Sequence, residues 1–483
     1  MNDDDLCYIS ATEALAKFQA RTLSPVELIK AIIHRAEDIH ETINPFADRY
    51  FDEALDAAKI SEKKYQNPDN YHGEMGKLEG LPLAVKDSTP IKGRRSTNGS
   101  LINKKRMDEF SNPSIERLLE NGANLFARTT CPEFCWLFTC HSRMWGVTRN
   151  PWRLDITPGG SSGGSAAALA AGGTTIATGS DSAGSIRQPA SQCGVVGYKP
   201  PYGRMPLSPY TSFNPYVQIG PMARTVADTA LMSNVMSGMH PLDHTSLSDT
   251  CILPEHPLDI TGMKIGFSTD LGHYDLDSEV EHEFLTSLQY LKDAGATVEN
   301  VPLSGLSEMI KLSHGVQEFE AHGFLQDAID NHSDVISDYV PELLETALKY
   351  NAEDLQRSKT LSGDIWQQIL GPIFQKYDAF LCPTVTTPLV PAEHWQTNTI
   401  LVGERHLTDT EITMTALFNH FSRCPVLAVP SGITTAGLPC GLQIVGRPYD
   451  DITVFRVGAA LEKVRPWLLT PESRPLLKLK EIK

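Results

Sequence analysis

The segment from residue 157 to residue 187 restricts most strongly the folds that this chain can adopt, because two glycine- and serine-rich stretches flank one apolar run. The first reads Thr157-Pro-Gly-Gly-Ser-Ser-Gly-Gly-Ser165, and the second reads Gly179-Ser-Asp-Ser-Ala-Gly-Ser-Ile-Arg187. A flexible linker fits poorly, since linkers do not enclose a well-formed helix and strand. Glycine-rich loops allow close backbone approach, and their successive N–H groups form concave anion sites. The segment therefore predicts two such loops around one helix.

The spacing of the two loops brings their serines within reach of each other. A helix over residues 162–171 rises roughly 15 Å, and a five- or six-residue strand returns roughly 17–20 Å. Ser161 and Ser185 can therefore meet. An isolated serine is a poor nucleophile and needs a base, but neither loop contains a histidine. The base must come from another part of the chain.

Lys86 is the candidate base. It follows the apolar run of residues 81–85, and a strand there would deliver the lysine to the edge of a sheet. Desolvation disfavours the charged form of a lysine, so a buried amine can serve as general base. A lysine after a strand is more often a surface charge, and position alone does not separate these two interpretations.

Composition bounds the function classes. Lys and Arg number 42 against 59 Asp and Glu, giving a formal net charge of −17, which disfavours a nucleic-acid partner. The nine cysteines are odd in number and scattered, as in a reduced cytosolic protein. Cys131, Cys135 and Cys140 lack zinc-ligand spacing, so buried or pocket-lining thiols are favoured over a metal site. No signal-peptide pattern or long apolar run occurs, so we expect a cytoplasmic protein without a membrane partner.

Alternating strand and helix patterns predict an α/β protein with a largely parallel or mixed sheet. Helices are expected over residues 24–35, 51–64, 115–121, 279–294 and 453–464, and strands over 81–85, 123–128, 264–267, 379–382, 426–429 and 442–445. Ser24 and Glu27 form a capping box at the first of these helices. No repeat or linker divides the pattern, so we expect one large domain. Within it, residues 1–70 form a helical region packed on the α/β core of residues 71–483, and residues 309–373 form a helical cap or surface helices.

Three motifs resemble the amidase signature family in order and spacing. They are Gly80-Leu-Pro-Leu-Ala-Val-Lys86-Asp87, Pro158-Gly-Gly-Ser-Ser-Gly-Gly164 and Gly179-Ser-Asp-Ser-Ala-Gly-Ser-Ile-Arg-Gln-Pro-Ala190. The resemblance continues in Thr148-Arg-Asn-Pro-Trp152, Cys193-Gly-Val-Val-Gly-Tyr-Lys-Pro200, Gly220-Pro-Met-Ala-Arg224, Phe380-Leu-Cys-Pro-Thr384, Ala428-Val-Pro-Ser-Gly432 and Gly437-Leu-Pro-Cys-Gly-Leu-Gln443. It is weakest between residues 254 and 377. The fold it implies is a large mixed β-sheet core covered by helices on both sides.

The resemblance also implies a Ser–cisSer–Lys triad. In it Ser185 is the nucleophile, Ser161 is a bridging serine preceded by a cis peptide bond, and Lys86 is the base. The backbone N–H groups of Ser182, Ala183, Gly184 and Ser185 would stabilise the oxyanion. Asp181 and Arg187 match family positions that we interpret as braces for this loop. Neither a metal nor an organic cofactor is implied.

Ala183 departs from the family, which commonly has glycine there. If this position needs a positive φ, alanine would strain the oxyanion loop. The geometry around residue 183 is therefore a specific question for the structure.

The activity implied is hydrolysis of a carboxamide C–N bond, other than a peptide bond, in a small linear or cyclic amide, through an acyl-enzyme. The alternative within the family is an A-subunit-like component of a glutamine-dependent tRNA amidotransferase. That component holds the glutamine ammonium with an acidic residue seven positions before an asparagine. The matching asparagine here is Asn419 and the matching position is Ile412, although Asp409 and Glu411 lie close by. A homodimer is a general expectation.

Two further function classes fit the residues less well. Gly159-Gly-Ser161-Ser-Gly163 satisfies the GxSxG pattern of α/β-hydrolases, but the polar, proline-bounded residues 151–158 do not form the strand that this motif requires. A catalytically silent scaffold would need a broken triad, and all three residues are present. Both classes are therefore disfavoured.

Pocket walls are the least determined feature. Residues 134–144, with Cys135, Trp136 and Cys140, are candidates for lining an acyl pocket, with ordinary core packing as the alternative. A second set that follows the nucleophile comprises Tyr198, Tyr210, Phe213, Asn214 and Tyr216. The histidines, among them His314, His322, His394 and His420, show no metal spacing and are expected to have structural roles.

Overall fold

A computed structural model describes residues 3–68, 74–209, 211–256, 258–393, 399–402, 405–468 and 470–476 of the chain. Tyr210 and His394, named above, lie outside these ranges. Within them, no helix is both long and apolar enough to cross a membrane.

One large sheet forms the centre of the molecule. Its strands are β1 (Phe46–Arg49), β2 (Pro82–Lys86), β3 (Asn124–Thr129), β6 (Ile176–Asp181), β7 (Val196–Lys199), β8 (Gln218–Ala223), β9 (Lys264–Phe267), β10 (Thr297–Asn300), β11 (Ala379–Pro383), β14 (Val426–Ile433) and β15 (Pro439–Gly446). Their order is β1-β3-β2-β6-β8-β7-β14-β15-β11-β9-β10, with 11 strands. Parallel and antiparallel pairs both occur, so the prediction of a mixed sheet is confirmed.

The register of β2 and β6 positions the site. These strands run parallel, with Leu83 opposite Ile176 and Ala84 opposite Ala177. Parallel neighbours end at the same edge of a sheet. Lys86 at the end of β2 and Asp181 at the end of β6 therefore lie at the same edge of the sheet. After Asp181 the chain enters the loop that carries Ser185.

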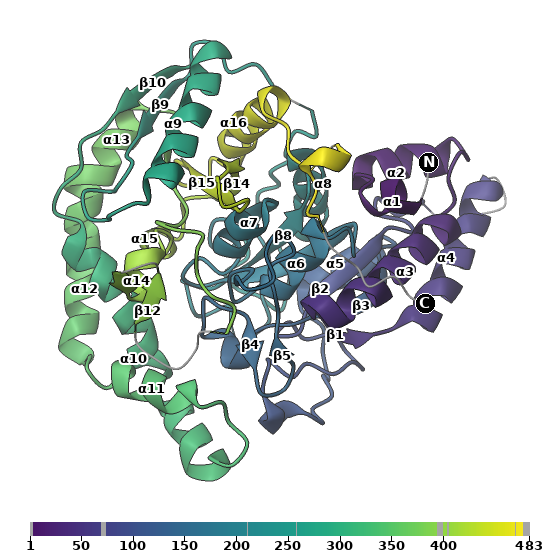
Figure 1. The fold of residues 1–483 in the computed structure, drawn as a ribbon, viewed down its shortest axis with the longest axis horizontal. Coiled ribbons are helices and arrows are strands. Elements are labelled where there is room, and N and C mark those ends of the chain that lie inside the picture. Colours follow the sequence, from purple (N-terminus) through teal and green to yellow (C-terminus); the bar gives the residue numbers. More distant parts are fainter. Residues whose placement is uncertain are drawn as a thin grey trace.

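Four helices precede and flank the first strands: α1 (Asp3–Cys7), α2 (Ala11–Gln19), α3 (Pro25–Ile43) and α4 (Phe51–Gln66). They lie together at the right of the view in Figure 1. The predicted capping box of Ser24 and Glu27 is present at the start of α3. Apolar residues of these helices share one buried cluster with strand residues, for example Ile32 with Leu83. The N-terminal helices are thus continuous with the central core.

Further helices cover the sheet and its connections: α5 (Pro113–Glu120), α6 (Gly163–Ala170), α7 (Arg187–Cys193), α8 (Val226–Met236), α9 (Ser278–Asp293) and α16 (Asp451–Val464). Short elements are η2 (Leu101–Asn103), η3 (Glu133–Cys135), β4 (His141–Ser142), β5 (Gly146–Val147), β12 (Ile400–Val402), β13 (Arg405–Leu407), α14 (Asp409–Ile412), α15 (Leu417–His420) and η5 (Pro471–Ser473). The helices and strands expected from sequence are therefore present, with most ends shifted by a few residues and the end of the first helix shifted from about Arg35 to Ile43.

The segment predicted to be helical over residues 309–373 is helical. It comprises α10 (Ser307–His332), α11 (Tyr339–Ala347), α12 (Ala352–Ile365), the π-helical turn η4 (Trp366–Leu370) and α13 (Gly371–Lys376). These elements form the left margin of the view in Figure 1. Leu325 of α10 and Tyr339 of α11 share a small apolar cluster with Phe134. This cluster ties the helical segment to the loop that precedes the first glycine-rich stretch.

Candidate active site

Lys86 lies fully buried at the end of β2. Its Nζ donates hydrogen bonds to Ser161 Oγ at 2.7 Å and to Ser180 Oγ at 2.9 Å. The peptide bond between Gly160 and Ser161 is cis. Strand β2 thus brings the lysine against both glycine- and serine-rich loops, as the candidate role for Lys86 requires, and the alternative of a surface charge is wrong.

The glycines of the first loop permit close packing around Ser161. A Cβ on Gly160 would lie 2.5 Å from the carbonyl oxygen of Thr139, and Gly159 has a φ of +82°. No strand directly precedes Ser161 in the described residues, and α6 begins at Gly163. The strand–nucleophile–helix turn of an α/β-hydrolase is therefore missing here.

The second loop approaches the first through its backbone. The N–H of Ser162 donates to the carbonyl oxygen of Ser185 at 3.1 Å, and Ser185 lines a cavity. Ser185 Oγ makes no hydrogen bond within the described part of the chain. Catalytic hydrogen bonds in unliganded enzymes are often long and tighten when substrate binds. The two loops therefore meet, as the helix and strand lengths predicted, and Ser185 lies in the cavity wall.

The backbone N–H groups of the second loop differ in availability. The Gly184 N–H donates to Asp181 Oδ1 at 2.8 Å, so it is already satisfied within the chain. The N–H groups of Ser182, Ala183 and Ser185 have no acceptor among the described residues. Of the four N–H groups predicted as oxyanion donors, three are thus unpaired within the described residues, and that of Gly184 is bonded to Asp181.

Glycine is required at position 184 rather than at position 183. Ala183 is not among the residues with positive φ, whereas Gly184 has a φ of +127°. A Cβ on Gly184 would collide with Thr415 Oγ1, which donates to the carbonyl oxygen of Ala183. Alanine at 183 therefore does not strain the backbone.

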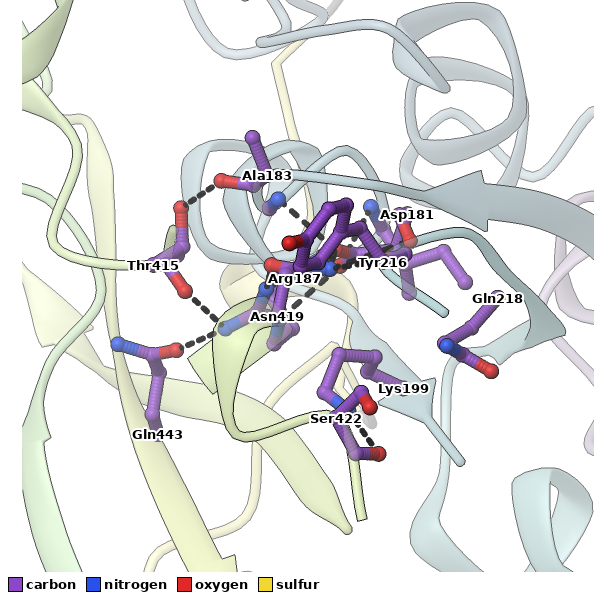
Figure 2. A network of polar contacts seen from close by, with 12 residues as sticks. Asp181, Ala183, Arg187, Lys199, Tyr216, Gln218, Thr415, Asn419, Ser422 and Gln443 are labelled. Atoms are coloured by element: carbon purple, nitrogen blue, oxygen red, sulfur yellow. Dashed lines mark hydrogen bonds and ion pairs between the residues drawn. The ribbon is translucent and has the colours of Figure 1, made fainter. Parts of the chain in front are cut away.

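A buried network fixes the second loop from below (Figure 2). Arg187 pairs with Asp181 through two hydrogen bonds of 2.9 Å, from Nε and from one terminal nitrogen. Its guanidinium also donates to Gln443 Oε1 at 2.6 Å and to Asn419 Oδ1. Asn419 Nδ2 donates to Asp181 Oδ1 at 2.9 Å and to the Tyr216 carbonyl at 3.0 Å. Residues from distant strands and helices thus hold one carboxylate in place.

The electrostatics of this network favour an ionised Asp181. Burial acts to raise the pKa of Asp181, but the Arg187 charge and the hydrogen bonds from Arg187 and Asn419 outweigh it and hold that pKa well below its usual range.

Nearby Lys199 is fully buried, like Lys86. Burial, followed by the Arg187 charge, lowers the pKa of Lys199 to about 7. Lys199 donates to backbone carbonyls, including that of Cys424 at 3.0 Å, and is absent from the cavity lining described here.

The cavity in front of Ser185 has a volume of ≈ 290 Å³. Its wall includes Phe134, Cys135, Trp136, Leu137 and Phe138, so the prediction for the first part of residues 134–144 is confirmed. Pockets that enclose drug-sized ligands measure roughly 300–1,000 Å³. The cavity therefore fits a small molecule.

Other predicted wall residues lie elsewhere. Cys140 is buried with its thiol directed at the Thr130 carbonyl. Tyr198 is in the core with its hydroxyl donating to Asp451, Phe213 is exposed, and Tyr216 packs against His420. Asn214 caps its own turn by accepting from the Tyr216 N–H. The prediction that these residues shape the cavity is wrong, because Leu207, Ser208, Thr211 and residues 217–219 of the same segment line it instead.

Comparison with known proteins fits this geometry. The Amidase family profile matches residues 27–455. The chain belongs to the amidase signature family. An acylamidase of Rhodococcus erythropolis is 31% identical over 97% of this chain and 98% of its own length. The A subunit of a glutamyl-tRNA(Gln) amidotransferase of Desulfotalea psychrophila is 30% identical over 94% and 97%.

A solved structure agrees with the placement in this family. A bacterial aryl acylamidase of the amidase signature family superposes with a TM-score of 0.86 at 26% identity, covering 95% of this chain and 97% of that chain. The fold and the family expected from the three motifs are thus confirmed. This amidase signature protein is similar to relatives with two different activities, so the substrate has to be argued from the cavity.

Several cavity residues were missed by the sequence analysis. Ser180, the second acceptor from Lys86, belongs to the quoted Gly179–Ala190 motif, so its position was a signal that we did not use. His314, Gln317, Glu318 and Asp409 also line the cavity. The residue spacing of this helical segment gave no sign that it lines a cavity, because the segment reaches the cavity only through tertiary packing.

Proposed function

We propose that this protein hydrolyses the C–N bond of small carboxamides, linear or cyclic, through a Ser185 acyl-enzyme. The observation that carries the proposal is the buried hydrogen bond from Lys86 Nζ to Ser161 Oγ, together with Ser185 in the cavity wall. A serine needs an adjacent base to attack an amide, and the described residues that line the cavity offer only one imidazole, that of His314.

The proposed mechanism moves one proton through Ser161. The unprotonated Lys86 amine accepts the Ser161 proton while Ser161 accepts the proton of Ser185, whose oxygen bonds to the carbonyl carbon. The carbonyl π electrons move to oxygen, and the resulting oxyanion is stabilised by the N–H groups of Ser182, Ala183 and Ser185. When the C–N bond breaks, the proton returns through Ser161 to the leaving nitrogen. Water then attacks the acyl-enzyme by the same route and releases the acid.

The alternative, a component of a glutamine-dependent amidotransferase, has one observation in its favour and two against it. The favourable one is the equally similar amidotransferase relative. Against it, Ile412, at the position of the glutamine-binding acid, is buried in an apolar cluster, and Glu411 is exposed and caps Thr408. In addition, the described residues that line the cavity include no lysine or arginine to pair with the glutamine carboxylate. Asp409 does line the cavity, so an acidic group for the glutamine ammonium is present, but no described lysine or arginine of the lining pairs with the glutamine carboxylate.

The test is hydrolysis of a mixed panel by the purified chain: anilides, aliphatic amides, cyclic amides, ureas, carbamates and glutamine. We expect turnover of at least one amide class, resistance to chelator, and a loss on the order of 10⁴-fold or more in kcat in Ser185→Ala and Lys86→Ala. Cys140→Ser, at a buried thiol outside the cavity wall, is the matched control. Turnover unchanged in Ser185→Ala would contradict the proposal, and glutamine hydrolysis only with added partner proteins would favour the alternative.

A further inference from the structure

One part of the cavity wall is built by the helical segment rather than by the family motifs. Helix α10 contributes His314, Gln317 and Glu318, and the start of α14 contributes Asp409. These helices lie close to each other in Figure 1. Two carboxyl groups from different elements therefore face the cavity that holds the reacting serine.

Two polar atoms of this wall lack partners, and two others have them. Oε2 of Glu318 and Nε2 of His314 are shielded from bulk solvent and have no hydrogen-bond partner among the described residues. Asp409 Oδ1 accepts from the adjacent Thr410 N–H at 2.8 Å, and Gln317 Nε2 donates to the Ser313 carbonyl at 3.0 Å. A buried polar group without a partner costs about 1–3 kcal/mol. Such groups in a cavity wall mark a place where a ligand supplies the missing partner.

The charge of the wall selects the kind of partner. Among the described residues that line the cavity, Glu318 and Asp409 are the only carboxyl groups, and there is no lysine or arginine. Lys349 acts on Glu318 electrostatically but does not line the cavity. His314 offers no compensating charge, because burial lowers the pKa of its imidazole. No positively charged side chain of the described lining therefore balances the two carboxyl groups.

We propose that Glu318 and Asp409, with His314 beside them, bind an ammonium or guanidinium group of the substrate while Ser185 attacks its amide. This proposal rests on the proposed amidase function and adds its substrate class: small amides that carry one basic group remote from the scissile bond. A zwitterion is a poorer fit, since its carboxylate would meet two carboxyl groups and no described cation in the wall.

The protonation of Glu318 fits this role. Burial, and then the Asp409 charge, raises the pKa of Glu318 to about 8. An arriving cation favours the ionised carboxylate, so cation binding is accompanied by proton release from Glu318 near neutral pH. The other groups that face Glu318 are Lys349, which lowers its pKa, and Tyr350, whose own pKa Glu318 raises.

The experiment compares substrates that differ only in the charge. A short series of ω-aminoacyl para-nitroanilides is paired with isosteres in which a methyl group replaces the ammonium, and kcat/KM is measured for each. We expect the wild type to prefer the cationic member, and Glu318→Gln to reduce this preference by about 10-fold to 100-fold, as for a lost charged hydrogen bond. Asp409→Asn tests the second carboxylate. Glu320→Gln, an exposed residue of α10 outside the lining, should leave the ratio unchanged.

A binding measurement separates this proposal from the amidase function. Calorimetric titration of Ser185→Ala with n-butylammonium and n-butylguanidinium, against n-pentanol, needs no turnover. Saturable binding of a cation that Glu318→Gln abolishes supports the site even if no amide in the panel is cleaved. Amide hydrolysis with equal or better rates for the methyl isosteres, or a preference unchanged in Glu318→Gln, would overturn the cation site and leave the amidase proposal standing.

Discussion

Two carboxyl groups, Asp181 in the network that holds the second loop and Glu318 in the wall of the cavity, are treated differently by the fold. Asp181, below Ser185, receives hydrogen bonds from Arg187, Asn419 and the Gly184 N–H, and its pKa is held well below the usual range. Glu318, on α10, has an unpartnered Oε2, and burial raises its pKa to about 8. Desolvation acts on both carboxyl groups, and the supply of partners within the chain decides the outcome.

The contrast separates polar groups that are paired within the protein from polar groups that are left for a ligand to pair. The Asp181 network is complete without substrate and fixes the loop that carries Ser185. The Glu318 wall is incomplete without a ligand, so its polar groups are costly to the folded protein and available for recognition. Breaking the first region should destabilise the protein, whereas neutralising the second should stabilise it.

The largest effect is expected for Asp181→Asn. Removing one charge of a buried pair leaves Arg187 uncompensated and costs about 3–5 kcal/mol in the free energy of unfolding. Because the pKa of Asp181 is lowered by folding, its contribution is present above the unfolded pKa of about 3.9 and is lost as the pH falls below it. Urea unfolding at pH 7 and in acid measures both.

The matched control for this substitution is Asp155→Asn, which breaks the exposed pair with Arg153. We expect a change of no more than about 1 kcal/mol there. Equal stability losses in the two variants would show that the buried network does not hold the second loop, which carries Ser185.

A smaller effect is expected for Gly184→Ala. The added Cβ meets the Thr415 side chain and a φ of +127° that alanine rarely adopts, so we expect a loss of about 2–4 kcal/mol in stability together with a lower kcat. Ala183→Gly, one residue earlier and without positive φ, should cost less than about 1 kcal/mol. The reverse order of the two losses, measured by thermal unfolding, would place the sensitive backbone position at 183.

The smallest effect, of opposite sign, is expected for Glu318→Gln. A pKa raised by folding means that ionisation of Glu318 destabilises the native state as the pH rises from about 4.3, the unfolded value, through about 8. The neutral variant should therefore be more stable than the wild type by about 1–3 kcal/mol at pH 9, with little difference at pH 4. Chemical unfolding at the two pH values measures this, and a variant less stable than the wild type at pH 9 would contradict it.

Much of the scaffold followed from local pattern. The capping box of Ser24 and Glu27, the apolar run before Lys86 and the spacing of the two glycine-rich loops act over a few residues, so the sequence exposes them directly. The same motifs predicted the family and brought Lys86 and Ser161 to the site. Alternating strands and helices likewise predicted the mixed sheet.

Cavity walls were harder, because a side chain's direction depends on the packing of distant segments. Phe134 and Cys135 were correctly placed, since they follow β3, which is parallel to β2 and ends beside Lys86. Tyr198, chosen by the same reasoning, lies in the core, because β7 is an interior strand of the sheet. Proximity in sequence to a motif thus predicts proximity to the site only where the chain stays at the same edge of the sheet.

The sequence by itself determined the fold class, the family and the residues of the candidate triad, because these depend on local propensity and on motifs of fixed spacing. Tertiary structure alone decided that the Gly184 N–H bonds to Asp181, and that α10 brings Glu318 to the cavity that Ser185 also lines. Both depend on which groups find partners after the chain has folded. Hydrogen bonding and desolvation between residues far apart in sequence, rather than any local signal, set that result.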